Sequence, residues 1–207
     1  MSGAPGDLAP PPEAYRPRGL YATALKPSCD FVGAALLLLA LAPLMAAVAV
    51  AVRLDSPGPA LFTQDRVGRG GRLFRICKFR TMRSDAGGPV LTQVGDPRIT
   101  RIGRFLRRTS LDELPQLFNI LRGEMSFIGP RPEVPSIVAS EYTPEMKGAL
   151  TVRPGLSGWA QVHGRDDLSI PTKLAYDVEY VRKLSPWLDL RICLLTPGLL
   201  LSGRGIK

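Results

Sequence analysis

The chain has 207 residues, enough for one domain of ordinary size with additional segments. Its formal charge of +9 and its pI near 9.9 indicate an anionic partner: a nucleic acid, anionic lipid headgroups or a phosphorylated small molecule. Three widely spaced cysteines exclude a disulfide framework and a zinc site, and the single histidine, His163, argues against a histidine-based metal site or catalytic triad.

The first part of the chain predicts a tail followed by a membrane helix. Residues 1–25 are Pro-rich and without apolar periodicity, so we expect a flexible tail. Residues 31–52 form an uncharged apolar run, long enough to cross a bilayer as a helix, which takes about 20 residues. A fully buried helix of a soluble protein is the alternative. We assign residues 26–53 to the membrane and residues 54–207 to a domain outside it.

Two features predict that the membrane helix does not cross. Basic residues flank the run on both sides, so the positive-inside rule places both ends in the cytoplasm. Pro43 lies in the middle, where it removes a backbone hydrogen bond and kinks the helix. Residues 31–42 would rise only about 18 Å as a helix. We therefore expect a re-entrant helical hairpin, with a single spanning helix as the alternative, since proline is tolerated in spanning helices.

Residues 60–82 predict a β-hairpin. Two runs with apolar, β-branched and aromatic residues flank a Gly-rich segment at residues 67–71. Alternation places Arg72, Lys78 and Arg80 on one face of the second strand. This stripe is either a solvated strand face or a site for phosphates or headgroups, for which Lys78 and Arg80 are candidates. Residues 84–97 are rich in Gly and Pro and predict a loop.

Two adjacent acids, Asp112 and Glu113, stand out in this basic chain. They follow a helix predicted for residues 99–108, which is amphipathic and Arg-rich and suits a membrane interface. They open a second predicted helix, which runs to about residue 121 and ends at Gly123. Carboxylates beside many cations are suited to phosphate chemistry, as a nucleophile or as ligands of a divalent ion. The alternative is a capping box formed by Ser110 and Glu113.

The remaining chain predicts short helices and rigid loops. Arg131 lies between two prolines in a turn at residues 125–132, and residues 136–150 predict a short helix interrupted near Pro144. The loop at residues 152–165 carries Arg153, Gln161 and Arg165 as candidate substrate-binding residues. Residues 170–184 predict a helix that contains Asp177, and residues 187–201 predict an interfacial or core helix, not a second span.

From residue 26 nearly to the end, the chain resembles the monotopic bacterial sugar transferases, the phosphoglycosyl transferases that act on polyprenyl phosphate, in their minimal catalytic-domain form. The matching motifs, in the family's order, are Phe62-Thr63-Gln64, Lys78-Phe79-Arg80-Thr81-Met82, Asp96-Pro97-Arg98, Ser110-Leu111-Asp112-Glu113-Leu114-Pro115-Gln116, Met125-Ser126-Phe127-Ile128-Gly129-Pro130-Arg131-Pro132 and Arg153-Pro154-Gly155-Leu156-Ser157-Gly158-Trp159-Ala160-Gln161-Val162.

The resemblance implies a fold and a location. It implies an α+β, mostly helical protein, with a re-entrant membrane helical hairpin and a cytoplasmic, membrane-associated catalytic domain. That domain would hold a small β-hairpin and interfacial amphipathic helices. The location implied is the cytoplasmic face of the bacterial inner membrane, in contact with membrane lipid. The oligomeric state stays open, and a homo-oligomer is compatible with the sequence.

The resemblance also implies a reaction. A nucleotide-sugar donor, on family grounds a UDP-sugar, gives its phosphosugar to undecaprenyl phosphate and releases UMP, with Mg²⁺ required. Asp112 would be the nucleophile that forms a covalent phosphosugar intermediate, and Glu113 would act with it. Phosphates would be bound by Lys78, Arg131 and Arg153, and the metal by Asp112, Glu113 and Asp177.

Two residues depart from the family's pattern, and two other classes of function compete. Ala42 stands where the family often has Ser before the mid-helix proline, and His163 stands where it usually has Asn.

One competing class is a non-enzymatic, membrane-anchored basic module that binds anionic lipid or nucleic acid, although the sequence has no nucleic-acid motif. The other is a different Mg²⁺-dependent phosphotransferase or a phosphatase. The sugar and the pathway stay open.

Overall fold

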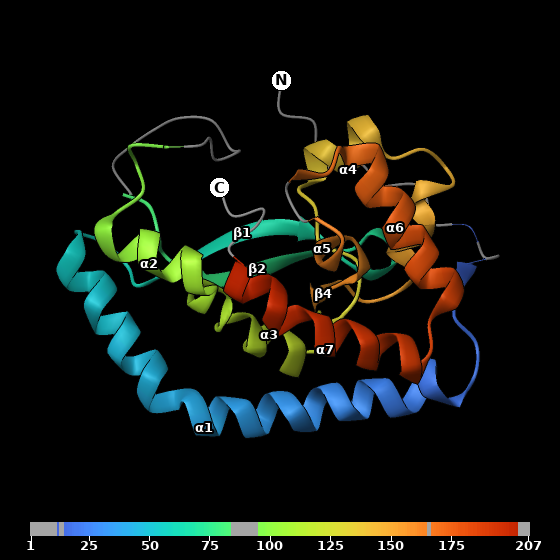
Figure 1. Ribbon diagram of the computed structural model, residues 1–207, viewed down its shortest axis with the longest axis horizontal. Coiled ribbons are helices and arrows are strands. Elements are labelled where there is room, and N and C mark those ends of the chain that lie inside the picture. Colours follow the sequence, from blue (N-terminus) through green and yellow to red (C-terminus); the bar gives the residue numbers. More distant parts are fainter. Residues whose placement is uncertain (1–11, 13–14, 84–94, 165–166, 203–207) are drawn as a thin grey trace.

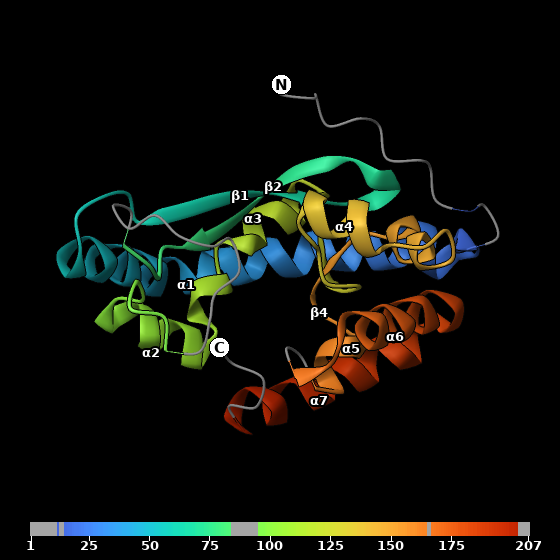
Figure 2. The same ribbon diagram turned by 90° about the horizontal axis from the view of Figure 1, so that it is seen from above.

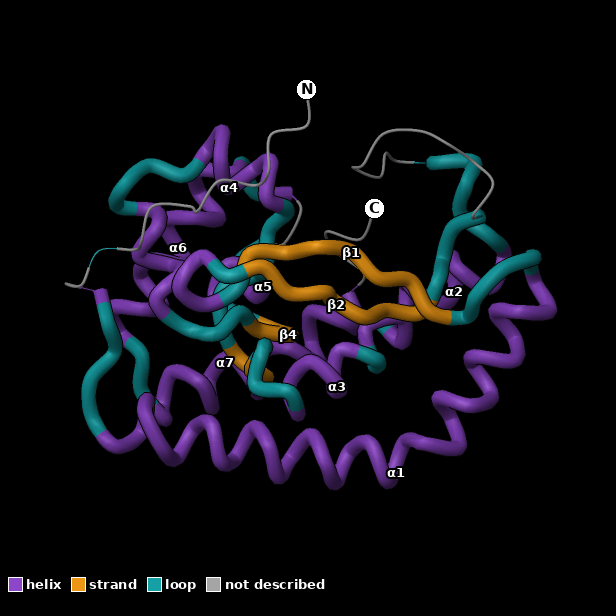
Figure 3. Tube along the Cα trace, turned by 180° about the vertical axis from the view of Figure 1, so that it is seen from behind, coloured by secondary structure: helices purple, strands orange, loops and turns teal. Residues whose placement is uncertain are grey.

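The computed structural model describes residues 12, 15–83, 95–164 and 167–202, and these residues are mostly helical with two small sheets (Figure 1). The long helix α1 (Lys26–Asp55) runs along one side of the molecule, and α7 (Pro186–Ser202) lies near it. Helix α3 (Gln116–Leu121) lies between α1 and the hairpin strand β2 and contacts both of them (Figure 3). This confirms the predicted mostly helical α+β class.

Helix α1 is one continuous helix that contains Pro43 and bends along its length (Figure 1). A π-helical turn at Tyr21–Leu25 leads directly into it, so the helix begins within the segment predicted as a tail. We attribute the bend to Pro43, which lacks the N–H that would continue the hydrogen-bond ladder. In the described part of the chain, Tyr21–Asp55 is the one helix that is long and apolar enough to cross a membrane. Most of its apolar window is exposed.

Both ends of α1 are attached to the rest of the protein. At the start, Lys26 Nζ lies 2.7 Å from Asp189 Oδ2 of α7. At the end, Asp55 Oδ2 accepts a hydrogen bond of 2.9 Å from the backbone N–H of Ile102 in α2 (Arg101–Thr109). Between these ends, apolar side chains such as Ala34 and Val48 pack against the domain in two separate clusters. The helix therefore lies along the domain over much of its length.

The predicted hairpin is present as β1 (Leu61–Val67) and β2 (Leu73–Phe79), which pair antiparallel with Phe62 opposite Lys78. The strands are joined through a 3-10 turn at Arg69–Gly71, where Gly70 has a φ of 72°. A second pair, β3 (Ser126–Ile128) and β4 (Gly155–Ser157), is parallel and was not predicted. A Cβ on Gly155 would lie 2.1 Å from the nitrogen of Gly129, so only glycine allows this approach.

The remaining helices follow the predictions except for α5 (Trp159–Val162), which lies within the predicted loop at residues 152–165. They are α2, capped by Thr100, then α4 (Pro135–Glu141), a 3-10 turn at Met146–Thr151, α5 (Trp159–Val162), α6 (Ile170–Lys183) and α7. Viewed from above, α5, α6 and α7 gather on one side of α1, and β1 lies on the other (Figure 2). Residues 84–94 of the predicted loop lie outside the described residues.

The described end of the predicted tail is fixed to the domain. The backbone oxygen of Tyr15 accepts a hydrogen bond of 2.9 Å from Thr151, and its hydroxyl accepts one of 2.7 Å from Arg182 of α6. The Arg182 guanidinium also lies over the Tyr15 ring, 5.1 Å from its centroid. Tyr15 therefore holds the chain against α6 before the long helix begins.

Candidate active site

The two adjacent acids lie in a tight turn between α2 and α3. Asp112 and Glu113 belong to a 3-10 turn at Leu111–Glu113, and Pro115 separates this turn from α3. Ser110 precedes the turn in the left-handed conformation, with a φ of 55°, and its side chain makes no capping hydrogen bond. The capping-box alternative is therefore wrong: the Glu113 carboxylate is used elsewhere.

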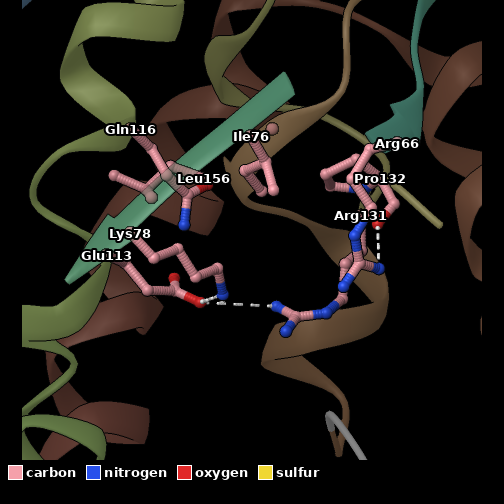
Figure 4. Close-up of a pocket in the computed structure, with 9 residues that line it drawn as sticks. Arg66, Ile76, Lys78, Glu113, Gln116, Arg131, Pro132 and Leu156 are labelled. Carbon is pink, nitrogen blue, oxygen red and sulfur yellow. Dashed lines mark hydrogen bonds and ion pairs between the residues drawn. The ribbon is translucent and has the colours of Figure 1, made fainter. Parts of the chain in front are cut away.

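Glu113 faces a pocket that is rich in cations. Lys78 Nζ lies 2.8 Å from Glu113 Oε1, and Arg131 Nη1 lies 3.8 Å from the same oxygen. Figure 4 shows these three side chains pointing toward one another from β2, the 3-10 turn and the Pro-flanked segment after β3. The residues that line the pocket are Arg66, Ile76, Lys78, Glu113, Gln116, Arg131, Pro132, Gly155 and Leu156. The predicted grouping of Lys78, Glu113 and Arg131 is thus present in the structure.

Asp112 has a perturbed ionisation. Burial and the neighbouring Glu113 carboxylate raise its pKa to about 6, although Lys78 and Arg107 oppose this rise. At neutral pH it is still mostly ionised, and it is less fully hydrated than a surface carboxylate. Arg107 is held by a hydrogen bond of 2.9 Å from its Nε to Thr81 Oγ1. The turn therefore places a partly dehydrated carboxylate within reach of two cations.

Two cations of the site had no individual role in the sequence prediction. Arg107 stood out only as one of several arginines before the acids. Arg66 in β1 lines the pocket and donates a hydrogen bond of 3.1 Å to the backbone oxygen of Pro132, next to Arg131. Burial and the nearby Arg131 lower the pKa of Arg66. The alternation of side chains along β1 could have predicted which face of the strand Arg66 occupies. It could not have predicted that Arg66 contacts the Pro-flanked segment after β3.

Arg80 lies outside the pocket lining. It is buried, and its guanidinium donates hydrogen bonds to the backbone oxygens of Val52 at 3.2 Å, of Ser56 at 2.7 Å and of Pro57. These carbonyls lie at the C-terminal end of α1, where a cation is favourable because it satisfies orphan acceptors and complements the helix dipole. The structure thus gives Arg80 a contact with the end of α1.

The other predicted substrate-binding residues are spread over the domain. Arg153 lies beside Gly123 at the end of α3, since a Cβ on that glycine would be 3.5 Å from Arg153 Nη2. Gln161 is buried in α5, and neither of its amide atoms has a hydrogen-bond partner among the described residues. Arg165 lies outside the described residues. Neither Arg153 nor Gln161 is among the described residues that line the pocket beside Glu113.

The structure does not gather the three predicted metal ligands. The described residues hold no group of three or more His, Cys, Asp or Glu side chains placed for one metal ion. Asp177 is buried in α6, where burial and Glu133 raise its pKa well above the usual range while Arg131 and Lys173 oppose this. Asp112 and Glu113 alone remain adjacent. Two carboxylates are a suitable donor set for Mg²⁺ when substrate phosphates complete its shell.

The site combines several cations with an adjoining pair of carboxylates. Cations from β1, β2 and the segment after β3 converge on the pocket, and cationic side chains suit phosphate oxygens. The Asp112 carboxylate lies in the adjoining turn. This arrangement agrees with the phosphate chemistry that the sequence predicted.

Comparison with known proteins identifies a family whose printed names also indicate phosphate chemistry. Residues 21–203 match the bacterial sugar transferase family. The chain is 48% identical over 186 residues to the undecaprenyl-phosphate glucose phosphotransferase of Komagataeibacter xylinus, covering 83% of this chain and 35% of the relative. It is 43% identical over 201 residues to the UDP-N-acetylgalactosamine-undecaprenyl-phosphate N-acetylgalactosaminephosphotransferase of Aeromonas hydrophila, covering 92% and 47%.

A shorter relative matches as well. The UDP-glucose:undecaprenyl-phosphate glucose-1-phosphate transferase of Caulobacter vibrioides is 46% identical over 181 residues, covering 83% of this chain and 68% of the relative. The chain spans between about a third and a half of the length of the other two relatives. The family match covers most of the chain and includes α1, the cation-lined pocket and the Asp112 turn. The chain belongs to the bacterial sugar transferase family.

Proposed function

We propose that the chain transfers a phosphosugar from a UDP-sugar to undecaprenyl phosphate, giving undecaprenyl-diphosphate-sugar and UMP. This would be the first membrane step of a surface polysaccharide or glycoconjugate pathway. The observation that carries the proposal is the cation-lined pocket next to Asp112, where Lys78 lies 2.8 Å from Glu113. The printed names of the relatives from Komagataeibacter, Aeromonas and Caulobacter support the same acceptor, undecaprenyl phosphate.

Asp112 acts as the nucleophile in this proposal. Its carboxylate oxygen attacks the sugar-bearing phosphorus, the bond from that phosphorus to the bridging oxygen breaks, and UMP leaves with the electron pair. An oxygen of undecaprenyl phosphate then attacks the same phosphorus. The bond to the Asp112 oxygen breaks, and the carboxylate is restored. A carboxylate with a pKa of about 6 is ionised at neutral pH, so no separate base is needed.

The cations lower the repulsion between this carboxylate and an anionic substrate. Lys78, Arg131 and Arg66 bind the phosphate oxygens of the donor, and Arg107 stands next to the nucleophile. A bound phosphate competes with Glu113 for Lys78 and Arg131, so the Glu113 carboxylate is released as the substrate arrives. Asp112 and Glu113 would then hold Mg²⁺, which supplies charge neutralisation and Lewis acidity at the phosphate oxygens.

The attachments of α1 support a proposed placement in the membrane. Both ends of the helix are attached to the same domain, through Lys26 to Asp189 and through Asp55 to Ile102. A helix that crosses a bilayer along its normal would carry its two ends to opposite sides, about 30 Å apart at least. The attachments support a re-entrant helix whose ends both lie on the cytoplasmic side. The site then lies at the level of the lipid phosphate, on the cytoplasmic face of the bacterial inner membrane.

UMP release tests the reaction. The protein in a native-like bilayer is given undecaprenyl phosphate, Mg²⁺ and a panel of UDP-sugars that begins with UDP-glucose, which two of the relatives' names suggest. Release that needs the lipid, the metal and Asp112 supports the proposal. Release of free phosphate would support a phosphatase instead. Salt-sensitive binding of anionic lipid without any turnover would support a non-enzymatic basic module.

A further inference from the structure

A buried asparagine joins α3 to the edge of β2. Asn119 in α3 has no exposed surface, and its carboxamide makes three hydrogen bonds. Its Oδ1 accepts one of 3.0 Å from the backbone N–H of Cys77, and its Nδ2 donates one of 2.7 Å to the backbone oxygen of Arg75. Nδ2 also donates one of 2.7 Å to Glu124 Oε2. All of its donor groups are therefore used.

These contacts imitate the pairing of a further strand. Cys77 N–H and Arg75 C=O come from alternate residues, so they point to the same edge of β2. The carboxamide offers that edge one acceptor and one donor, as the C=O and N–H of one residue in a neighbouring strand would. A directional pair of this kind fixes where α3 stands along β2. The apolar cluster that includes Ile76 and Leu117 also holds the two elements together, but it does not fix their register, because hydrophobic contacts are non-directional.

This register connects the two sides of the site. Lys78 follows Cys77 directly in β2, and the turn with Asp112 and Glu113 leads through Pro115 into α3. A displacement of α3 along β2 therefore changes the distance between Lys78 Nζ and Glu113 Oε1. Asn119 itself is fully buried and is not among the residues that line the pocket, so it would act on the site only through Lys78 and the turn.

We infer that Asn119 is a positioning residue for the proposed phosphosugar transfer. By binding the edge of β2, it sets the separation between Lys78 and the Asp112–Glu113 turn, so that a phosphate held by Lys78 meets the nucleophile. The inference rests on the proposed function for its kinetic consequence. Its structural consequence, the pairing of Lys78 with Glu113, can be measured without any turnover.

The first experiment measures that pairing. Asn119→Asp keeps the shape and the acceptor of the side chain but removes both donor contacts and places a carboxylate next to Glu124. Lysine acetylation, followed by peptide mass spectrometry, is measured on the full chain in a lipid bilayer. We expect labelling of Lys78 to rise several-fold relative to exposed Lys183. Glu124→Ala removes only the hydrogen bond between Asn119 and Glu124, so labelling of Lys78 should rise less. This milder variant still tests the inference if Asn119→Asp does not fold.

The second experiment is a double-mutant cycle on turnover. In the wild-type background, Asn119→Asp should lower kcat about a hundredfold, the effect of misplacing reacting groups by about 1 Å, with the KM for the donor nearly unchanged. In a Lys78→Met background it should have no further effect, because the group it positions is gone. Leu174→Ala, a buried change in α6 away from the site, serves as the control for lost stability and should give equal losses in both backgrounds.

The two experiments separate the possible failures. Unchanged labelling of Lys78 in folded Asn119→Asp would overturn the inference, and so would an equal loss of kcat in both backgrounds. Absence of UMP release from the wild-type protein would overturn the proposed function instead. In that case the labelling result would still decide whether Asn119 sets the position of Lys78.

Discussion

Lys78 and Arg131 share a single oxygen of Glu113, with Lys78 Nζ at 2.8 Å and Arg131 Nη1 at 3.8 Å. The side chains of Lys78 and Glu113 are 19% and 13% exposed, so the pair is largely shielded from water. Shielding strengthens the attraction between the pair and also makes either charge costly when left alone. The carboxylate therefore holds two cations in place at the pocket.

Removal of the ammonium should affect turnover more than folding. Lys78→Met is expected to lower kcat/KM about a hundredfold or more, because a phosphate loses a charge-assisted contact and Glu113 loses the ammonium that lies 2.8 Å from it. The measurement is initial-rate UMP release over a range of donor concentrations. Lys78→Arg, which keeps the charge, should recover part of the loss. Similar rates for Lys78→Met and wild type would contradict the phosphate role of Lys78.

Asp112→Asn should abolish turnover and stabilise the fold at neutral pH. The pKa of Asp112 is raised to about 6 in the folded protein, so the free energy of unfolding falls as the pH rises from about 4 to about 6 and changes little above that. The variant lacks this cost, which is on the order of 3 kcal/mol at pH 8 and disappears below about pH 4. Unfolding in EDTA at several pH values measures the difference. A variant that is less stable at pH 8 would contradict this assignment.

The rate of transfer should fall on the acid side of neutrality. A nucleophile with a pKa of about 6 loses its charge as the pH falls through that value, so kcat/KM should drop about tenfold for each unit of pH below it. Bound Mg²⁺ favours the ionised form and would move the midpoint to lower pH. A profile that is flat from pH 5 to pH 8 at limiting donor would argue against a titrating nucleophile.

Substitution by methionine should lower stability at Arg80 but weaken donor binding at Arg131. Arg80→Met removes hydrogen bonds to carbonyls at the end of α1, so we expect a loss on the order of 2 to 4 kcal/mol in the free energy of unfolding. Arg131→Met should instead raise the KM for the donor with little change in stability, because its guanidinium is a third exposed and faces the pocket. Thermal unfolding and initial rates of the two variants, measured side by side, separate these effects.

The attachments of α1 predict the topology of the chain. Reporter tags fused to the two termini should both lie in the cytoplasm, because Lys26 and Asp55 hold the two ends of the helix to one domain. Lys26→Ala combined with Asp55→Ala tests the cause, since it should weaken these attachments without removing the apolar run. A periplasmic N-terminus in the wild-type protein would show a spanning helix instead.

The sequence was most informative where the pattern is long or the chemistry is local. The apolar run predicted α1, alternation predicted the hairpin around residues 67–71, and Arg-rich periodicity predicted α2. Motif order identified the family. These features depend on neighbouring residues or on a run of one kind of side chain.

The sequence was least informative where elements are short and where contacts join residues that lie far apart in the chain. Strands β3 and β4 have three residues each and depend on the backbone approach that Gly155 permits, which no periodicity records. The Ser110–Glu113 pattern suggested a helix cap. In the structure, Ser110 has a left-handed backbone conformation and its side chain makes no cap, while Glu113 forms an ion pair with Lys78. Arg80 fell on the predicted cationic face, yet its partners are carbonyls of α1, which only the packing of β2 against that helix reveals.

The central claim is that Asp112 carries the phosphosugar between donor and lipid. Intact-protein and peptide mass spectrometry of the protein, incubated with Mg²⁺ and its UDP-sugar but without undecaprenyl phosphate, tests this claim most directly. The account predicts one added sugar phosphate on Asp112, which disappears when the lipid is supplied and never forms in Asp112→Asn. Product formation by an enzyme that shows no adduct, or an adduct on another residue, would contradict it.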